Sequence, residues 1–133
     1  MKSLFPQEML TSSELSIESI AAKLTYFHEQ LHLLHWQTQS YAEHMALGGL
    51  YEYVHDFKDG VIEKLMGYSG RKISGMEMKP VVPTSSTAVV IDLMDFAGQL
   101  KRYGDSNGYH DIGNLADSLS GEAAKCKYLL TLS

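Results

Sequence analysis

Proline occurs at only three positions, Pro6, Pro80 and Pro83, and so leaves two long stretches in which a helix can run without interruption. Within these stretches the apolar residues recur at steps of three and four, which gathers their side chains on one face of a helix. Four such apolar stripes follow one another along the chain. They predict four amphipathic helices that bury their apolar faces against one another in an all-α four-helix bundle.

Caps and helix breakers predict where these helices begin and end. The first is expected to begin in Thr11–Glu14, a capping-box pattern in which Glu14 reaches back to the cap amide. Residues 69–86 include two prolines and predict a long connection between the second and third helices. The other expected bounds are a turn at residues 37–41, a second helix over 41–68, a third from Ser85 or Ser86 to Gly104, and a fourth capped by Asp111 with a stripe that reaches Leu130.

Length and charge narrow the classes of protein that fit. A chain of 133 residues suits one domain, here residues 1–133. Its net charge of −5, with no run of lysine or arginine, argues against a nucleic-acid binder. No apolar run approaches the roughly 20 residues of a spanning helix, so no membrane partner is expected. The single cysteine, Cys126, forms no internal disulfide, and a reducing, cytoplasmic location is expected.

Histidine is unevenly distributed, because five of the six lie within 28 residues. On the expected second helix, histidines and acids recur at one-turn steps and form a polar stripe away from the apolar one. Imidazole and carboxylate together suit iron, manganese or zinc, although a solvated helix surface shows the same polarity. The members of this stripe are His44, Gly48, Glu52, His55, Asp59 and Glu63, and those of the histidine face on the first helix are His28, His32 and His35.

Three segments carry a resemblance to the Dps family, the mini-ferritins: Leu31–Trp36 (LHLLHW), His44, and Asp59–Glu63 (DGVIE). That family shows a His-Trp pair near the end of the first helix, a histidine near the start of the second, and an Asp-x-x-x-Glu pair further along. The intervals from His44 to Asp59 and Glu63 match its spacing. The interval from His35 to His44 is shorter than usual by about three residues, which places a deletion in the turn.

The resemblance implies a ferritin-like bundle with a long connection between helices 2 and 3, assembled as a homodimer or as the hollow dodecamer of that family. It also implies an iron site between subunits, where ferrous iron is oxidised and then stored. His35 and His44 would come from one subunit, and Asp59 and Glu63 from its twofold mate. The family usually carries a further acid one turn after the second histidine, where this chain has Gly48.

Other arrangements remain open at this point. Glu29-x-x-His32 and Glu52-x-x-His55 are the units of an intrachain di-iron centre, although the third and fourth helices offer no matching pair. In the Dps-like interpretation, Glu52 and His55 instead help line the interface, and His32, Glu52 and His55 are further candidate metal ligands. Three histidines, His32, His35 and His55, would suit a zinc hydrolase. The chain could also be a structural or interaction bundle that has lost oxidation chemistry, since Gly48 removes a ligand.

Overall fold

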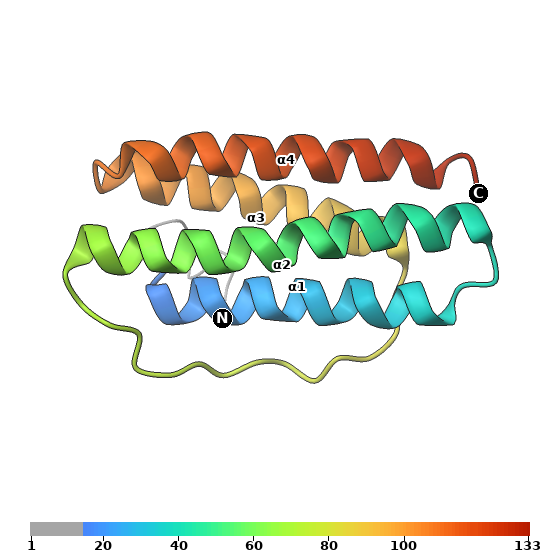
Figure 1. Cartoon of the computed structure of the whole chain (residues 1–133), viewed down its shortest axis with the longest axis horizontal. Coiled ribbons are helices and arrows are strands. Elements are labelled where there is room, and N and C mark those ends of the chain that lie inside the picture. The colour runs from blue at the N-terminus through green and yellow to red at the C-terminus, as the bar shows by residue number, and fades with distance from the viewer. Residues whose placement is uncertain (1–14) are drawn as a thin grey trace, which may run out of the picture.

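The computed structural model describes residues 15–133, which form four helices and, within that range, no strand (Figure 1). The prediction of an all-helical four-helix bundle is confirmed for this part of the chain. Nowhere in it does a helix combine the length and the apolar character that crossing a membrane requires. The helices are α1 (Ile17–Gln37), α2 (Tyr41–Ser69), α3 (Ser86–Ser106) and α4 (His110–Leu130).

Two helical hairpins are joined by one long crossover. Short turns at residues 38–40 and 107–109 connect α1 to α2 and α3 to α4. Residues 70–85 run back along the bundle, so α2 and α3 point in the same direction (Figure 1). The helix α1 packs on α2 and α3, whereas α4 packs on α3 and α2. Because α2 borders both α1 and α4, its remaining face is turned outward.

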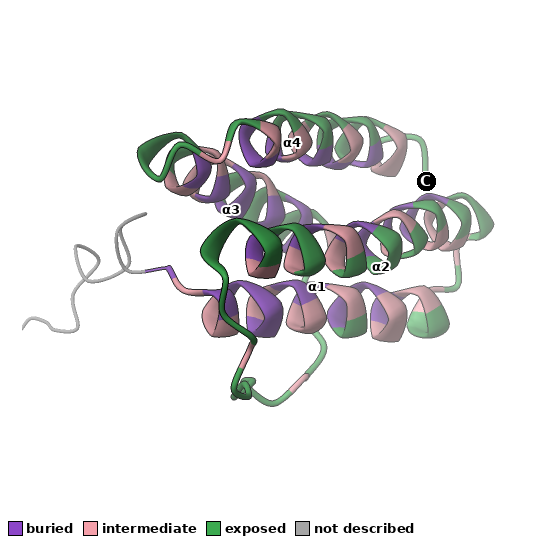
Figure 2. Cartoon of the chain, turned by 60° about the vertical axis from the view of Figure 1, so that its left-hand side comes forward, coloured by how far each residue is buried: buried purple, intermediate pink, exposed green. Residues whose placement is uncertain are grey.

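The apolar stripes form a single core between the four helices (Figure 2). Cys126 belongs to it, with its thiol donating to the carbonyl oxygen of Ala46 at 3.5 Å. Burial raises the pKa of this thiol to about 11, so it stays protonated at neutral pH. Among the apolar side chains, those that lie fully buried include Ile20, Leu24, Leu31, Leu47, Leu65, Leu93, Leu100, Ile112 and Leu119.

Two of the helices begin at other residues than the sequence predicts. The expected cap at Thr11 lies outside the described residues, and the helix that follows begins at Ile17, after a capping box of Ser16 and Ser19. The cap at Ser85 is confirmed. Asp111 does not cap α4, contrary to the sequence prediction, because the N-cap is Tyr109, two residues earlier, and the helix begins at His110. Asp111 instead pairs with Lys64 at 2.7 Å, so its carboxylate is directed toward α2.

Gly104 does not end α3, contrary to the sequence prediction. It is buried inside the helix, where an added Cβ would lie 2.9 Å from both Cβ and Cγ2 of Ile112. The chain turns only at Asn107 and at Gly108, whose φ of +73° suits glycine. Gly104 is therefore a contact point at which α3 and α4 approach closely, and this packing offsets its low helix propensity.

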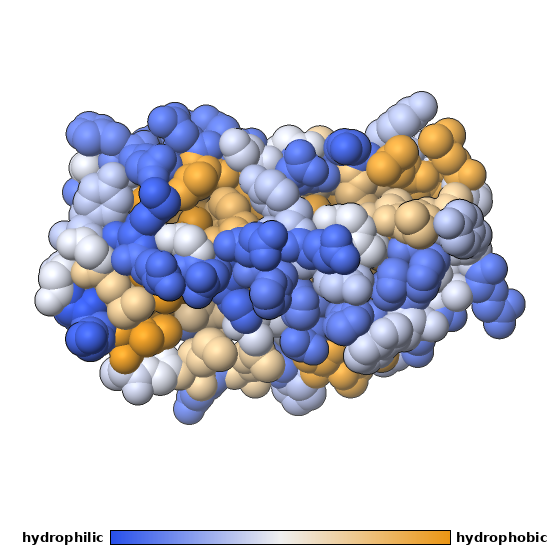
Figure 3. Space-filling view, viewed as in Figure 1, coloured by the Kyte–Doolittle hydropathy of each residue, from blue (hydrophilic) through white to orange (hydrophobic). Residues whose placement is uncertain are grey.

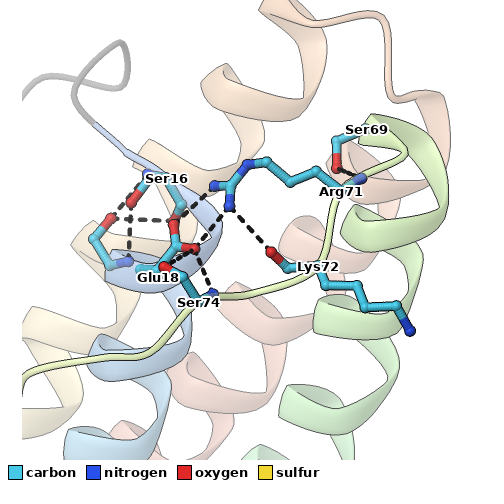
Figure 4. A network of polar contacts seen from close by, with 7 residues as sticks. Ser16, Glu18, Ser69, Arg71, Lys72 and Ser74 are labelled. Carbon is cyan, nitrogen blue, oxygen red and sulfur yellow. Dashed lines mark hydrogen bonds and ion pairs between the residues drawn. The ribbon is translucent and has the colours of Figure 1, made fainter.

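The crossover is fastened to α1 at two places. Near its start, Arg71 makes two 2.8 Å contacts to the carboxylate of Glu18, and the backbone N–H of Ser74 donates to the same group at 2.9 Å (Figure 4). The Arg71 guanidinium holds the pKa of Glu18 well below its usual range. Near its end, the buried amide of Gln30 donates to the Val82 carbonyl at 2.7 Å and to the Thr84 hydroxyl at 2.8 Å.

The Glu18 contact predicts a pH-dependent stability. Because the folded-state pKa lies below the ordinary value near 4.5, the stabilisation is present above pH 4.5 and is lost as the pH falls below it. We expect Glu18→Gln to lower the free energy of unfolding at pH 7, and this difference from wild type to shrink at pH 3. Urea unfolding at both values measures it. Glu77→Gln, an exposed crossover acid, is the control, and a difference independent of pH would contradict the prediction.

The close approach at Gly104 predicts a steric penalty. Gly104→Ala should lower the free energy of unfolding by about 1–3 kcal/mol, since the added methyl group overlaps Ile112 in a packed core. The matched variant Gly121→Ala, at an exposed α4 position with nothing within 4 Å of the new Cβ, should raise it by about 0.5–1 kcal/mol. Thermal or urea unfolding of both variants checks this. Stabilisation by both would show that α3 and α4 can separate freely.

Candidate functional site

Along the α1–α2 hairpin, residues of α1 lie opposite residues of α2 at regular intervals, and each such pairing forms one level of the hairpin. Each step of three or four residues along α1 is met by an equal step back along α2. The levels are Thr25 with Lys58 (3.2 Å hydrogen bond), His28 with His55 (ring centroids 5.5 Å apart), His32 with Tyr51 (4.4 Å), and His35 with the backbone at Gly48. A surface of imidazole and phenol rings therefore runs along the outer side of this hairpin.

His35 and His44 meet at the closed end of the hairpin. Their rings stack with centroids 3.7 Å apart and planes 20° from parallel. The Nδ1 of His35 donates to the carbonyl oxygen of His44 at 2.7 Å, and the Nδ1 of His44 donates to the carbonyl oxygen of His35 at 2.9 Å. Because a carbonyl only accepts, Nδ1 carries the proton in both rings. Nε2 is the remaining nitrogen, and a histidine held in this way is typical of metal ligands.

Gly48 is explained by the position of the His35 ring. An added Cβ at Gly48 would lie 3.1 Å from Cε1 and 3.3 Å from Nδ1 of that ring. The close approach of the His35 ring therefore explains a glycine at this position inside the helix. The imidazole of His35 thus lies against the α2 backbone at the position where the resemblance leads one to expect an acid.

Asp59 and Glu63 lie far from this pair along the same helix. Both are exposed, and the 15 residues from His44 to Asp59 correspond to about 22 Å of helix. Within one chain these acids therefore cannot share an ion with His44. Across residues 15–133, no group of three or more His, Cys, Asp or Glu side chains lies close enough to hold a metal.

The other candidate residues are spread along the same face. Glu52 is exposed. His32 lies between the rings of Tyr51 and Trp36, with centroid distances of 4.4 and 4.0 Å. Glu29, the acid of the first Glu-x-x-His unit, accepts from His28 Nδ1 at 3.1 Å. In the described part of the chain, neither the di-iron units nor the three-histidine set forms a preorganised site of three ligands.

Large exposed side chains surround the closed end of the hairpin. Trp36, Tyr41 and Met45 are 66%, 77% and 55% exposed. Seen from the side shown in Figure 3, hydrophilic side chains cover much of α2, and hydrophobic patches lie toward the margins of the molecule. A contiguous exposed apolar patch with polar residues at its rim is typical of protein–protein contacts.

A groove of about 600 Å³ lies elsewhere, between α1, α3 and the crossover. Lys23 and Lys79 line it together with Asp92 and Asp95. Burial, together with the charge of Lys79, lowers the pKa of Lys23. This groove could not be predicted from the sequence, because apolar periodicity does not show the path of a crossover without secondary structure.

Comparison with known proteins gives a family but no described activity. The sequence model of a family described as "Family of unknown function (DUF5856)" matches residues 35–130. A protein of Enterobacteria phage T4, named "Uncharacterized 14.6 kDa protein in mobD-ri intergenic region", is 27% identical over 114 residues, which cover 85% of this chain and 83% of the phage protein. No solved structure matches.

The contact between His35 and Gly48 predicts different outcomes for two adjacent glycines. Gly49→Ala, which meets nothing within 4 Å, should raise the free energy of unfolding by about 0.5–1 kcal/mol. Gly48→Ala should raise the free energy of unfolding by less, because the His35 ring must move. The same variant should shift the imidazole NMR signals of His35 and His44. Thermal unfolding and NMR spectra of both variants measure this. Equal stabilisation with unchanged imidazole signals would contradict it.

Proposed function

We propose that this chain, which belongs to the DUF5856 family, is a ferritin-like bundle of the Dps kind that binds and oxidises iron between two copies of itself. The observation that carries the proposal is the state of His35 and His44. Their Nδ1 atoms are bound to backbone carbonyls, which leaves Nε2 of each ring for an ion. Zinc or manganese would suit the same kinds of ligand.

A second copy would supply the carboxylates. His44 and Asp59 lie about 22 Å apart along α2, so an antiparallel copy of this helix can bring each His44 opposite the other copy's Asp59. A twofold axis then makes the site twice, with Glu63 one turn beyond Asp59. Trp36, Tyr41 and Met45, all more than half exposed, supply apolar surface for such a contact. The minimum assembly is a homodimer, and the dodecamer of the Dps family is the larger form.

The topology adds independent support. One long crossover between two helical hairpins is the connection of ferritin-like bundles. The crossover lies along α1, and α2 packs on α1 and α4, so residues 15–133 leave the polar stripe of α2 uncovered.

In this proposal iron is the substrate. Neutral imidazole and carboxylate ligands bind both Fe²⁺ and Fe³⁺, so these residues hold iron while an oxidant takes its electrons. Two ferrous ions reduce one hydrogen peroxide to two hydroxides, and the ferric product is stored. Without an acid at position 48, the site has less negative charge than the family pattern implies, and we expect it to bind iron more weakly.

A second candidate function is structural. The reciprocal hydrogen bonds and the stacking of His35 on His44 close the α1–α2 turn without any metal. In that role the bundle is an interaction protein that has lost oxidation chemistry, and the exposed aromatic side chains are its contact surface.

A complementation experiment distinguishes these functions. His44→Ala and Asp59→Asn should each abolish the oxidation of added ferrous iron, because each homodimer lacks one half of both sites. After unfolding and refolding together in equal amounts, half of the dimers combine both variants, and each holds one intact site. The mixture should recover about a quarter of the wild-type rate.

The control is Asp92→Asn, an exposed acid on α3, which should leave the rate unchanged. Absorbance of the ferric product gives the rate. If the mixture stayed inactive while wild type oxidised iron, the site would not be shared between copies. Oxidation by wild type no faster than in buffer would favour the structural function.

A further inference from the structure

His28 and His55 form a second pair of imidazoles, one level away from His32 and Tyr51 in the α1–α2 hairpin. Their ring centroids are 5.5 Å apart and their planes meet at 48°. A zinc ion bound through nitrogen at 2.0–2.1 Å lies about 3.2 Å from each ring centroid, which puts two such rings about 5 Å apart at the tetrahedral angle. The separation of His28 and His55 therefore fits two ligands of one ion.

The hydrogen bonds of both rings also favour metal binding. The Nδ1 of His28 contacts the Glu29 carboxylate at 3.1 Å, and the Nδ1 of His55 contacts the Asp56 carboxylate at 3.2 Å. A carboxylate accepts this proton, so Nε2 is the nitrogen left to bind a metal. A carboxylate on the far nitrogen of a ligating histidine orients the ring and makes it a stronger ligand.

This pair differs from His35 and His44 in geometry. Those rings stack at 3.7 Å and are nearly parallel. His28 and His55 are wider apart, at 5.5 Å, and their planes are inclined by 48°. The side chain of His28 is 13% exposed and that of His55 66%, so the pair is firmly held on one side and open to solvent on the other.

From these contacts we propose that His28 and His55 of a single chain bind one divalent metal ion that favours imidazole ligands, such as zinc. Two protein ligands leave the other positions to water, which is consistent with the finding that residues 15–133 hold no preorganised group of three ligands. The ion would join α1 to α2 midway along the hairpin. This site requires neither a second copy nor iron oxidation, and so it does not depend on the function proposed above.

The test is a calorimetric titration of the metal-free full-length protein with Zn²⁺, in a His44→Ala background that disables the proposed intersubunit site. We expect one zinc per chain. Adding His55→Ala or His28→Ala should weaken binding at least tenfold, whereas adding His110→Ala, which changes an exposed histidine at the start of α4, should not. Asp56→Asn should weaken it by a smaller factor, through the orientation of His55.

Two further measurements guard against misfolding and misassignment. Circular dichroism of the His55→Ala variant should match its parent, because this side chain is largely exposed, and zinc should raise the unfolding temperature of the parent only. Zinc should also shift the imidazole NMR signals of His28 and His55. The inference is wrong if His44→Ala binds no zinc, or if the variants at His28 and His55 bind it as tightly as their parent.

Discussion

The register between α1 and α2 is the constraint on which the imidazole surface depends. The turn at residues 38–40 is three residues long, so it draws the end of α1 close to the start of α2. His35 is thereby brought onto both His44 and the bare backbone at Gly48. From that point each turn of α1 faces a fixed turn of α2, as far as the hydrogen bond between Thr25 and Lys58. A longer turn would change every one of these pairings.

The crossover determines what the hairpin presents to the outside. Its bonds to Glu18 and Gln30 hold it along α1, and α2 is packed between α1 and α4. The stripe that contains Asp59 and Glu63 therefore stays exposed. In the proposed function this exposure is useful, because ligands that cannot meet within one chain can meet across a twofold axis. The pair of His28 and His55, by contrast, is complete within one hairpin.

The parts of the fold that depend on periodicity could be predicted from the sequence, and the parts that depend on contacts could not. The apolar stripes gave four helices, because burial of one face follows directly from the 3.6-residue repeat. Gly104 was mistaken for a helix end because a glycine that breaks a helix and one that admits a neighbour look alike in sequence. Asp111 was mistaken for a cap because its partner, Lys64, is distant in the chain.

For the candidate site, the sequence by itself determined that histidines gather on two helices and that acids share a stripe with His44. These facts follow from spacing along a regular helix. Only the tertiary structure decided that His35 stacks on His44, that Gly48 makes room for it, and that His28 lies beside His55. Such contacts depend on how two helices are set against each other, and that setting is fixed by the turn and the core together.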